Sequence, residues 1–274
     1  MATSELIGIL ISLLGGGGII GFITNFLKKR ITYKKIKSKN DKDIIPFIHL
    51  YQNVIDEHIR IRSEELIKFI NRPVLDGLDD NLLIWKKAGK IVSFVKFIYL
   101  EDIDAVFLAY FGYDKTDNEI RQISSEFMVN DFLVYIKKKY KRCKYVFFEA
   151  ESHRTSILLK QKKQYGLLKL FKMMIAKMGM DLYEIDFDYL QPEMPDIYDG
   201  FVREVPMSLA FIPIRFEKKY IHKDDLLKLL EILYLKIYSR TYENDEFYEL
   251  YLDYLREILI KYEGRLASVI KLNA

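Results

Sequence analysis

The segment KYVFFEAES contains two carboxylates, Glu149 and Glu151, separated by a single alanine. The apolar and aromatic residues before them predict a buried strand, and side chains two residues apart on a strand share one face. A carboxylate held on such a face can act as a general base, and the nearby His153 could relay a proton. The alternative is that both carboxylates face solvent near the strand end and that His153 is simply exposed.

Tyr189 and Gln191 are further candidates, because they close the alternating stretch DLYEIDFDYLQP. This alternation predicts one strand with Tyr183, Ile185, Phe187 and Tyr189 on the same face. Tyr189 and Gln191 could orient a reacting group at its end. A tyrosine on an alternating apolar face is, however, more often part of the core.

The elements that would position these residues follow from hydrophobic periodicity and turn residues. We expect a β-hairpin with its turn at Ala88-Gly89-Lys90, and a long helix preceded by the capping box of Thr116 and Glu119. The expected strands are Asn81–Trp85, Ile91–Leu100, Ala105–Tyr113, Tyr145–Glu151 and Pro206–Phe216, and a second helix is expected over Gln161–Met178.

The two ends of this region have a different character. A short extended piece around Ile44–Ile48 is expected to lead into helical sequence that ends before Pro73. From His222 onward, two amphipathic patterns joined by a short connection predict a helical hairpin packed on the body, assigned to residues 217–274.

This order of elements resembles the GNAT superfamily of acetyl-CoA-dependent N-acetyltransferases. The resemblance covers residues 43–216. Its strongest local likeness is MMIAKMGM, Met173–Met180, which looks like the family's helix before the penultimate strand. It implies an α/β fold with a mixed central sheet and flanking helices, together with acetyl-CoA or another acyl-CoA as cofactor.

The resemblance also implies where the cofactor would bind. The family holds the cofactor's pyrophosphate on backbone N–H groups of a glycine-containing stretch at a helix N-terminus. Here that stretch falls on serines, and the following Glu126 would oppose a pyrophosphate. The implied cofactor-binding residues are Tyr110, Gly112, Arg121, Ser124 and Ser125.

The implied catalytic residues are Glu149, Glu151 and Tyr189. In the resembled fold this strand diverges from its neighbour, so a carboxylate there could accept a proton from an amine acceptor. The family's tyrosine that protonates the leaving thiolate would fall on Ile175. Two functions stay open: an N-acyltransferase, or a catalytically degenerate GNAT-like sensor, scaffold or membrane-acting defence effector.

The N-terminal region predicts a membrane anchor, because Leu6–Leu27 contains no charged residue and is long enough to span a bilayer as a helix. Its four consecutive glycines lack the residues that follow the glycines of a phosphate loop. The basic cluster Lys28–Arg30 places the rest of the chain in the cytoplasm. We therefore expect an anchor over residues 1–30, a basic juxtamembrane linker over 31–42, and a membrane-anchored enzyme that acts on the cytoplasmic side. The alternative is an amphipathic or oligomer-core segment buried in protein.

Small residues spaced four apart in this segment could bring two helices together in lipid and so form a homo-oligomer. These residues are Gly8, Ser12, Gly16, Gly17 and Gly21. The formal net charge of +4 is concentrated in residues 28–42, which leaves the remainder mildly acidic and argues against nucleic-acid binding. The four histidines are scattered and Cys143 is the single cysteine, so no metal-ligand motif or disulfide framework is expected.

Overall fold

A computed structural model describes residues 31–55, 60–70, 74, 76–116, 130–151, 171–172, 175–176, 179–185, 187–192, 204–215 and 220–273. Within these residues the strands form one mixed sheet in the order β1-β2-β3-β4-β5-β8-β6-β10-β9, with β7 also paired to β8. Of the pairings described, only that between β4 and β5 is parallel. The α/β class with a mixed central sheet is thus confirmed.

The N-terminal half of the sheet consists of β1 (Ile31–Ile36), β2 (Leu78–Lys87), β3 (Lys90–Leu100) and β4 (Ala105–Tyr113). The expected hairpin forms between β2 and β3. Its two-residue turn has positive φ at both positions, 49° at Ala88 and 84° at Gly89, as a type I′ turn requires. Such a turn matches the right-handed twist of the flanking strands and fixes their register.

The C-terminal half contains β5 (Tyr145–Glu151), β6 (Tyr183–Ile185), β7 (Tyr189–Pro192) and β8 (Glu204–Pro213). The stretch expected as one alternating strand is therefore divided into β6 and β7, both of which pair with β8. Two short strands that we did not expect, β9 (Tyr220–His222) and β10 (Val269–Asn273), extend this half.

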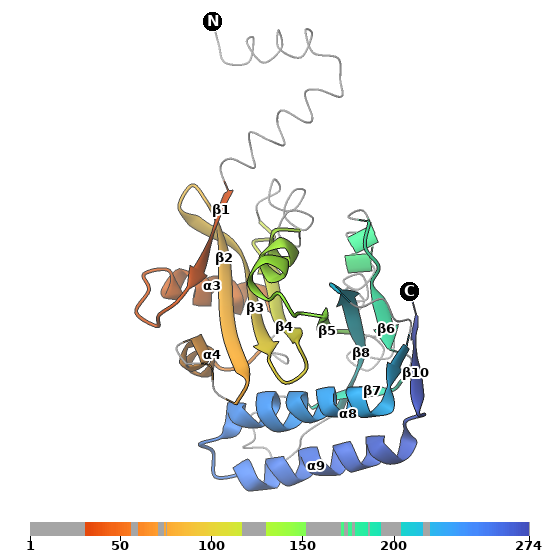
Figure 1. Ribbon diagram of the computed structural model, residues 1–274. Coiled ribbons are helices and arrows are strands. Elements are labelled where there is room, and N and C mark those ends of the chain that lie inside the picture. Colours follow the sequence, from red (N-terminus) through yellow and green to blue (C-terminus); the bar gives the residue numbers. More distant parts are fainter. Residues whose placement is uncertain are drawn as a thin grey trace, which may run out of the picture.

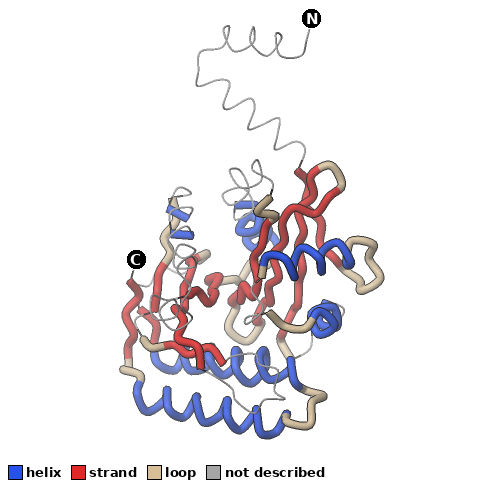
Figure 2. The backbone as a smooth tube through the Cα atoms, turned by 180° about the vertical axis from the view of Figure 1, so that it is seen from behind, coloured by secondary structure: helices blue, strands red, loops and turns tan. Residues whose placement is uncertain are grey.

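Helices cover both faces of the sheet. Residues 130–139, with Phe171 and Ile175, pack on one face. On the other face, α3 (Ile44–Val54) and α4 (Ser63–Ile70) cover the N-terminal half. Figure 2 shows the helix α3 lying across those strands. The extended piece expected around Ile44–Ile48 is wrong, because these residues form the first turns of α3.

The expected C-terminal helical hairpin covers the remainder of that second face. Its first arm runs through α8 (Lys223–Glu231), a π-helical segment η3 (Ile232–Tyr238) and a 3₁₀ turn η4 (Ser239–Tyr242). The second arm is α9 (Tyr248–Arg265), which lies alongside α8 in Figure 1. Because β10 follows α9 and pairs with β6, the hairpin is integrated into the sheet rather than appended to it.

Residues 31–42 contain the first strand where the sequence indicated a linker. β1 pairs with β2 along its whole length, from Ile31 opposite Lys87 to Ile36 opposite Leu82. Lys34 forms ion pairs with Asp41 at 2.7 Å and Asp43 at 3.0 Å, which ties the following turn to the strand. An edge strand tolerates basic residues such as Lys34 and Lys35, and these residues made the stretch look like a basic linker in the sequence.

None of the helices in the described part of the chain is long and apolar enough to cross a membrane. The expected anchor at Leu6–Leu27, with its proposed oligomerisation residues, lies outside the described residues. The same holds for Glu119 of the expected capping box and for most of the helix expected over Gln161–Met178.

β4 and β5 diverge in the centre of the sheet. Their parallel pairing is limited to three steps, the last of which joins Phe107 to Phe147. Beyond it, β4 carries a bulge at Ala109, since Lys96 of β3 lies opposite Tyr110 while Phe97 lies opposite Leu108. A bulge bends its strand and increases the local twist. The two strands therefore separate where the candidate residue Glu149 lies.

Candidate functional site

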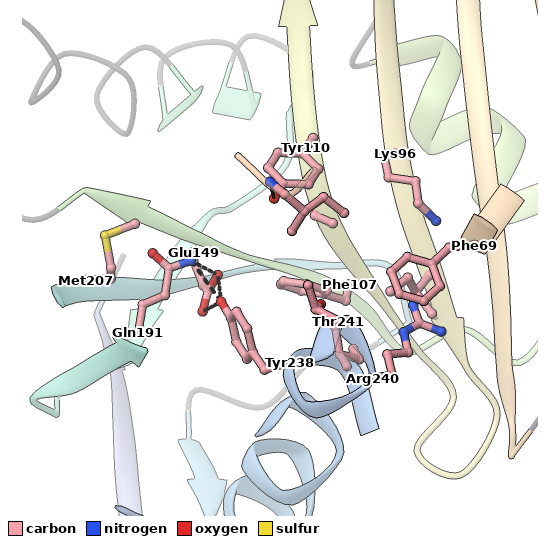
Figure 3. Close-up of a pocket in the computed structure, with 14 residues that line it drawn as sticks. Phe69, Lys96, Phe107, Tyr110, Glu149, Gln191, Met207, Tyr238, Arg240 and Thr241 are labelled. Atoms are coloured by element: carbon pink, nitrogen blue, oxygen red, sulfur yellow. Dashed lines mark hydrogen bonds between the residues drawn. The ribbon is translucent and has the colours of Figure 1, made fainter. Parts of the chain in front are cut away.

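A cavity opens beside the diverging strands, on the sheet face shared by α4 and the C-terminal hairpin. Its volume is about 100 Å³. Figure 3 shows polar groups at two ends of this cavity, with apolar side chains such as Phe107 between them. The lining residues include Ile61, Phe69, Lys96, Ile98, Phe107, Ala109, Tyr110, Glu149, Gln191, Met207, Ile237, Tyr238, Arg240 and Thr241.

One polar end is centred on the carboxyl group of Glu149. Tyr238 lies with its hydroxyl 2.7 Å from Oε1 and 2.6 Å from Oε2, and Gln191 donates to Oε2 at 2.7 Å. The hydroxyl of Tyr189 donates to Oε1. Gln191 also donates to the oxygen of Tyr238 at 2.8 Å, so the amide and the two hydroxyls form one connected network around the carboxyl group.

Loss of hydration raises the pKa of Glu149 to about 7, although the hydrogen bonds from Tyr189, Tyr238 and Gln191 oppose this increase. These bonds favour the ionised form, whereas removal from water favours the neutral form. The result is a carboxyl group that lines a cavity and changes its charge near neutral pH. Such a group is suited to accept and return a proton.

The strand register explains why these groups meet. On β5, Tyr145, Phe147 and Glu149 point toward the hairpin, whereas Val146 and Phe148 belong to the core on the opposite face. β5 and β7 both pair with β8, where Leu209 lies opposite Glu149. This shared neighbour brings Tyr189 and Gln191 of β7 close to the carboxyl group.

Tyr238 comes from the hairpin and ends the π-helical segment η3. A π-helical segment offsets the side chains that follow it relative to a regular α-helix, and such segments often occur at functional sites. The hydroxyl of Ser239 donates to the carbonyl of Leu235 at 2.7 Å, a bond that competes with regular helical bonding. The irregular segment thus turns both Tyr238 and Arg240 toward the cavity.

The other polar end contains three charged groups. Arg240 donates to Asp80 from both terminal nitrogens, at 2.7 and 3.0 Å, and Lys96 forms a second ion pair with the same carboxylate. The side chain of Lys96 is 3% exposed and that of Arg240 is 9% exposed. Burial lowers the pKa of Lys96, an effect that Asp80 opposes and Arg240 reinforces.

The structure brings some of the residues selected from the sequence together, whereas others lie outside its described part. Glu149, Tyr189 and Gln191 meet at one site. The side chain of Glu151 lies outside the described part, as do Arg121, Ser124, Ser125 and His153. Tyr110 is buried, lines the cavity and accepts a hydrogen bond from the backbone of Ile61 at 3.4 Å.

Gly112 has a packing reason to be glycine. A Cβ added there would lie 2.6 Å from side-chain atoms of Phe94 and Val54. Its carbonyl accepts a hydrogen bond from Ser93 at 2.7 Å. Ile175, the position that the resemblance assigned to a proton-donating tyrosine, is fully buried in the core on the opposite face of the sheet.

Sequence reasoning missed Tyr238, Lys96, Arg240 and Asp80. The only local signal is Lys96, which interrupts the otherwise apolar run of β3 and so indicates a buried charge that needs a partner. Arg240 pairs with Asp80 across 160 residues, a separation that no periodicity reveals. Among the described residues, no group of His, Cys, Asp and Glu could hold a metal ion.

Comparison with solved structures supports the fold. The chain is similar to a protein assigned to the GNAT acetyltransferase family from Bacteroides thetaiotaomicron, with a TM-score of 0.51 and 14% identity over 76% of this chain and 98% of that one. It is similar to the Escherichia coli ribosomal-protein-S18-alanine N-acetyltransferase, with a TM-score of 0.43 and 12% identity over 69% and 97% of the two chains.

A third similar structure is the diaminobutyrate acetyltransferase of Paenibacillus lautus in complex with diaminobutyric acid and coenzyme A. Its TM-score is 0.43 and its identity is 13%, over 69% of this chain and 97% of that one. No protein-family model matches the sequence, and no curated protein matches it. The likeness to the Bacteroides thetaiotaomicron protein supports a GNAT-like fold, at a sequence identity too low to transfer an activity.

Proposed function

We propose that this protein is an acyl-CoA-dependent N-acyltransferase, with Glu149 as the general base for an amine acceptor. The observation that carries the proposal is a carboxyl group of pKa about 7 that lines a cavity where β4 and β5 separate. A base with a pKa near the working pH combines a useful ionised fraction with sufficient basicity. The GNAT-like fold agrees with this chemistry.

Acyl-CoA would bind along the diverging strands. Past Phe107 and Phe147, the facing edges of β4 and β5 no longer pair with each other, so their backbone groups are available to an extended amide-containing ligand. Bound acyl-CoA supplies the thioester, and the transfer forms a C–N bond to the acceptor while the C–S bond breaks. Arg121, Ser124 and Ser125, which follow β4 in the sequence and lie outside the described residues, remain the proposed pyrophosphate site.

Glu149 would take the proton that the acceptor nitrogen loses as the C–N bond forms. Tyr238 and Tyr189 would stabilise the carboxylate before transfer through the hydrogen bonds that they already donate. Glu149 would then pass this proton to the departing thiolate, which leaves as a thiol. The balance is one amide and one thiol formed from one amine and one thioester.

Two measurements test this function. Calorimetry with acetyl-CoA should give micromolar affinity, and thiol release with a panel of primary amines should report turnover. Buried Cys143 adds little thiol background, since burial raises its pKa to about 12. Replacement Glu149→Gln should lower turnover by about 10²–10⁴-fold, the usual contribution of a general base. The matched change Glu257→Gln, on the exposed side of α9, should leave turnover unchanged.

One observation favours a second function, a catalytically degenerate sensor or scaffold. The buried Ile175 leaves the fold without the expected thiolate-protonating tyrosine at that position. No binding of acetyl-CoA at millimolar concentration would support this alternative. Unchanged turnover in Glu149→Gln, with acetyl-CoA still bound, would instead remove only this residue from the mechanism.

We also propose that Leu6–Leu27 anchors the protein in a membrane, with the body on the cytoplasmic side and with self-association through the small residues of the anchor. The proposal rests on the uncharged sequence and on the basic cluster after it. Since β1 begins at Ile31, the body would lie close to the bilayer. Full-length protein should remain in the pellet after alkaline extraction of membranes, whereas a chain beginning at Lys28 should be released.

A further inference from the structure

The three charged groups at the second end of the cavity do not balance. Lys96 and Arg240 carry two positive charges, and Asp80 carries one negative charge. The negative charge of Asp79 also acts on Lys96, but Asp79 forms its own ion pair with Lys139 at 2.9 Å. The Nε–H of Arg240 is buried and has no hydrogen-bond partner among the described residues. Within the same part of the chain, Asp80 is the one hydrogen-bond partner found for the ammonium of Lys96. An ammonium has three donors, so this end has both spare charge and spare donors.

A purely structural role explains only part of this arrangement. The bidentate pair of Arg240 and Asp80 connects the hairpin to β2 and is electrically neutral by itself. Lys96 adds a second cation, and an unbalanced buried charge costs free energy unless something pairs with it. The guanidinium of Arg240 also lies 4.4 Å from the centre of the Phe69 ring, a contact that holds it in place at the cavity wall.

From this geometry we propose that Lys96 and Arg240 bind a carboxylate of the acceptor, so that the acceptor is an amine that carries a carboxylate. This assignment of the acceptor rests on the proposed function, in which the amine lies at Glu149. Figure 3 shows Lys96 and Arg240 on the side of the cavity opposite Glu149 and Tyr238. Phe107 lies between the two ends, and the lining of the cavity also includes the apolar residues Ile98, Ala109 and Ile237.

The charge count selects a carboxylate over a phosphate. The excess at this end is a single positive charge, which one carboxylate neutralises, whereas a phosphate monoester carries nearly two negative charges at neutral pH. Asp80 already accepts from both terminal nitrogens of Arg240, so the unpaired Nε–H of Arg240 and the ammonium of Lys96 would each donate to one oxygen of a carboxylate. The apolar middle of the cavity suits a short hydrocarbon spacer between the carboxylate and the amine.

The test uses caproate as the probe, because it has the spacer and the carboxylate but no amine, and its binding requires no acyl-CoA. Calorimetry on the full chain should detect caproate, and caproamide should bind at least tenfold more weakly. Replacement Lys96→Met preserves the length of the side chain and leaves the neutral pair of Arg240 and Asp80. This replacement should lower the affinity for caproate at least tenfold, and the thermal stability should equal or exceed that of the wild type.

Lys228→Met is the matched control, since Lys228 is exposed on α8 and donates a hydrogen bond to the carbonyl of Asp102 at 3.3 Å, away from the residues that line the cavity. It should leave caproate affinity unchanged. Equal affinity for caproate and caproamide, or no binding of either, would overturn the carboxylate site. Tighter binding of hexyl phosphate than of caproate would overturn the choice of carboxylate.

The comparison of caproate with caproamide is made on the wild-type chain, so it decides the question even if Lys96→Met does not fold. With turnover established, ε-aminocaproate should be acylated with at least tenfold higher kcat/KM than hexylamine. If caproate binds while no amine is acylated, the carboxylate site stands and the proposed transfer fails. If amines are acylated with no preference for the carboxylate, the transfer stands and the carboxylate site fails.

Discussion

The hydroxyl of Tyr238 should set the pH at which Glu149 becomes ionised. It lies within 2.7 Å of both carboxylate oxygens and is itself positioned by the amide of Gln191. In Tyr238→Phe the carboxylate loses this donor, while its surroundings stay equally apolar. A hydrogen bond to a charged group contributes about 1.5–3 kcal/mol, and 1.36 kcal/mol corresponds to one pKa unit. The pKa of Glu149 should therefore rise from about 7 by about 1–2 units.

This shift has a direct kinetic consequence. At pH 7 the ionised fraction of Glu149 would fall from about one half to between roughly one tenth and one hundredth, so turnover should decrease about 5- to 50-fold. Raising the pH to 9 should recover most of the loss, because the base is then ionised in the variant as well. A variant that only disturbed the fold would lose activity at every pH.

The titration can be measured without an acceptor. Carbon-13 labelling of glutamate carboxyl groups allows the resonance that titrates near neutrality to be followed, and its disappearance in Glu149→Gln assigns it. Tyr251→Phe is the control, since that hydroxyl belongs to the same hairpin, is buried and has no hydrogen-bond partner among the described residues. A midpoint that moves by less than half a unit in Tyr238→Phe, or that falls, would refute this account of the network.

The remaining predictions concern stability and reactivity. Gly112→Ala should destabilise the fold by about 1–3 kcal/mol in urea unfolding, because its Cβ would meet two side chains at 2.6 Å. Gly264→Ala, where a Cβ would meet nothing within 4 Å, should be neutral or stabilising by up to about 1 kcal/mol. Cys143 is buried with its pKa raised to about 12, so iodoacetamide should label it only as fast as the protein opens, and rapid labelling of folded protein would contradict the packing. Because the pKa of Glu149 is raised from 4.5 to about 7, the folded state keeps this proton while the unfolded state releases it. The free energy of unfolding of the wild type should thus fall by about 3 kcal/mol, relative to that of Glu149→Gln, as the pH rises through that window. Parallel pH profiles of unfolding for the two proteins would refute the shift.

Much of the sheet could be predicted because its strands carry local signals. The hairpin of β2 and β3 follows from aromatic and β-branched runs around Ala88-Gly89, and β4 was predicted with the bounds that it has, Ala105–Tyr113. β9 and β10 span three and five residues, too few for a period to emerge. β1 was missed for a different reason, since basic residues on an edge strand resemble a solvated linker.

The residues of the candidate site also separate into those with a local sequence signal and those without one. Glu149, Tyr189 and Gln191 lie near strand ends, where alternation indicates which residues share a face. Their partner Tyr238 lies 89 positions beyond Glu149 in an irregular helical turn, and nothing in the local pattern distinguishes it from a core tyrosine. Long-range pairing of this kind is created by the packing of the hairpin on the sheet, so a sequence without its fold cannot reveal it.

The two ends of the cavity have opposite electrostatic needs. At one end, loss of hydration raises the pKa of Glu149 to about 7, so its carboxyl group is about half protonated at pH 7. At the other end, burial and Arg240 lower the pKa of Lys96. An ammonium near Glu149 would lower the pKa of that carboxyl group and ionise it, and a carboxylate near Lys96 would raise the pKa of the lysine and keep it charged. A zwitterionic acceptor would relieve both costs together, and its own charge would bring Glu149 into the ionised form that the proposed transfer requires.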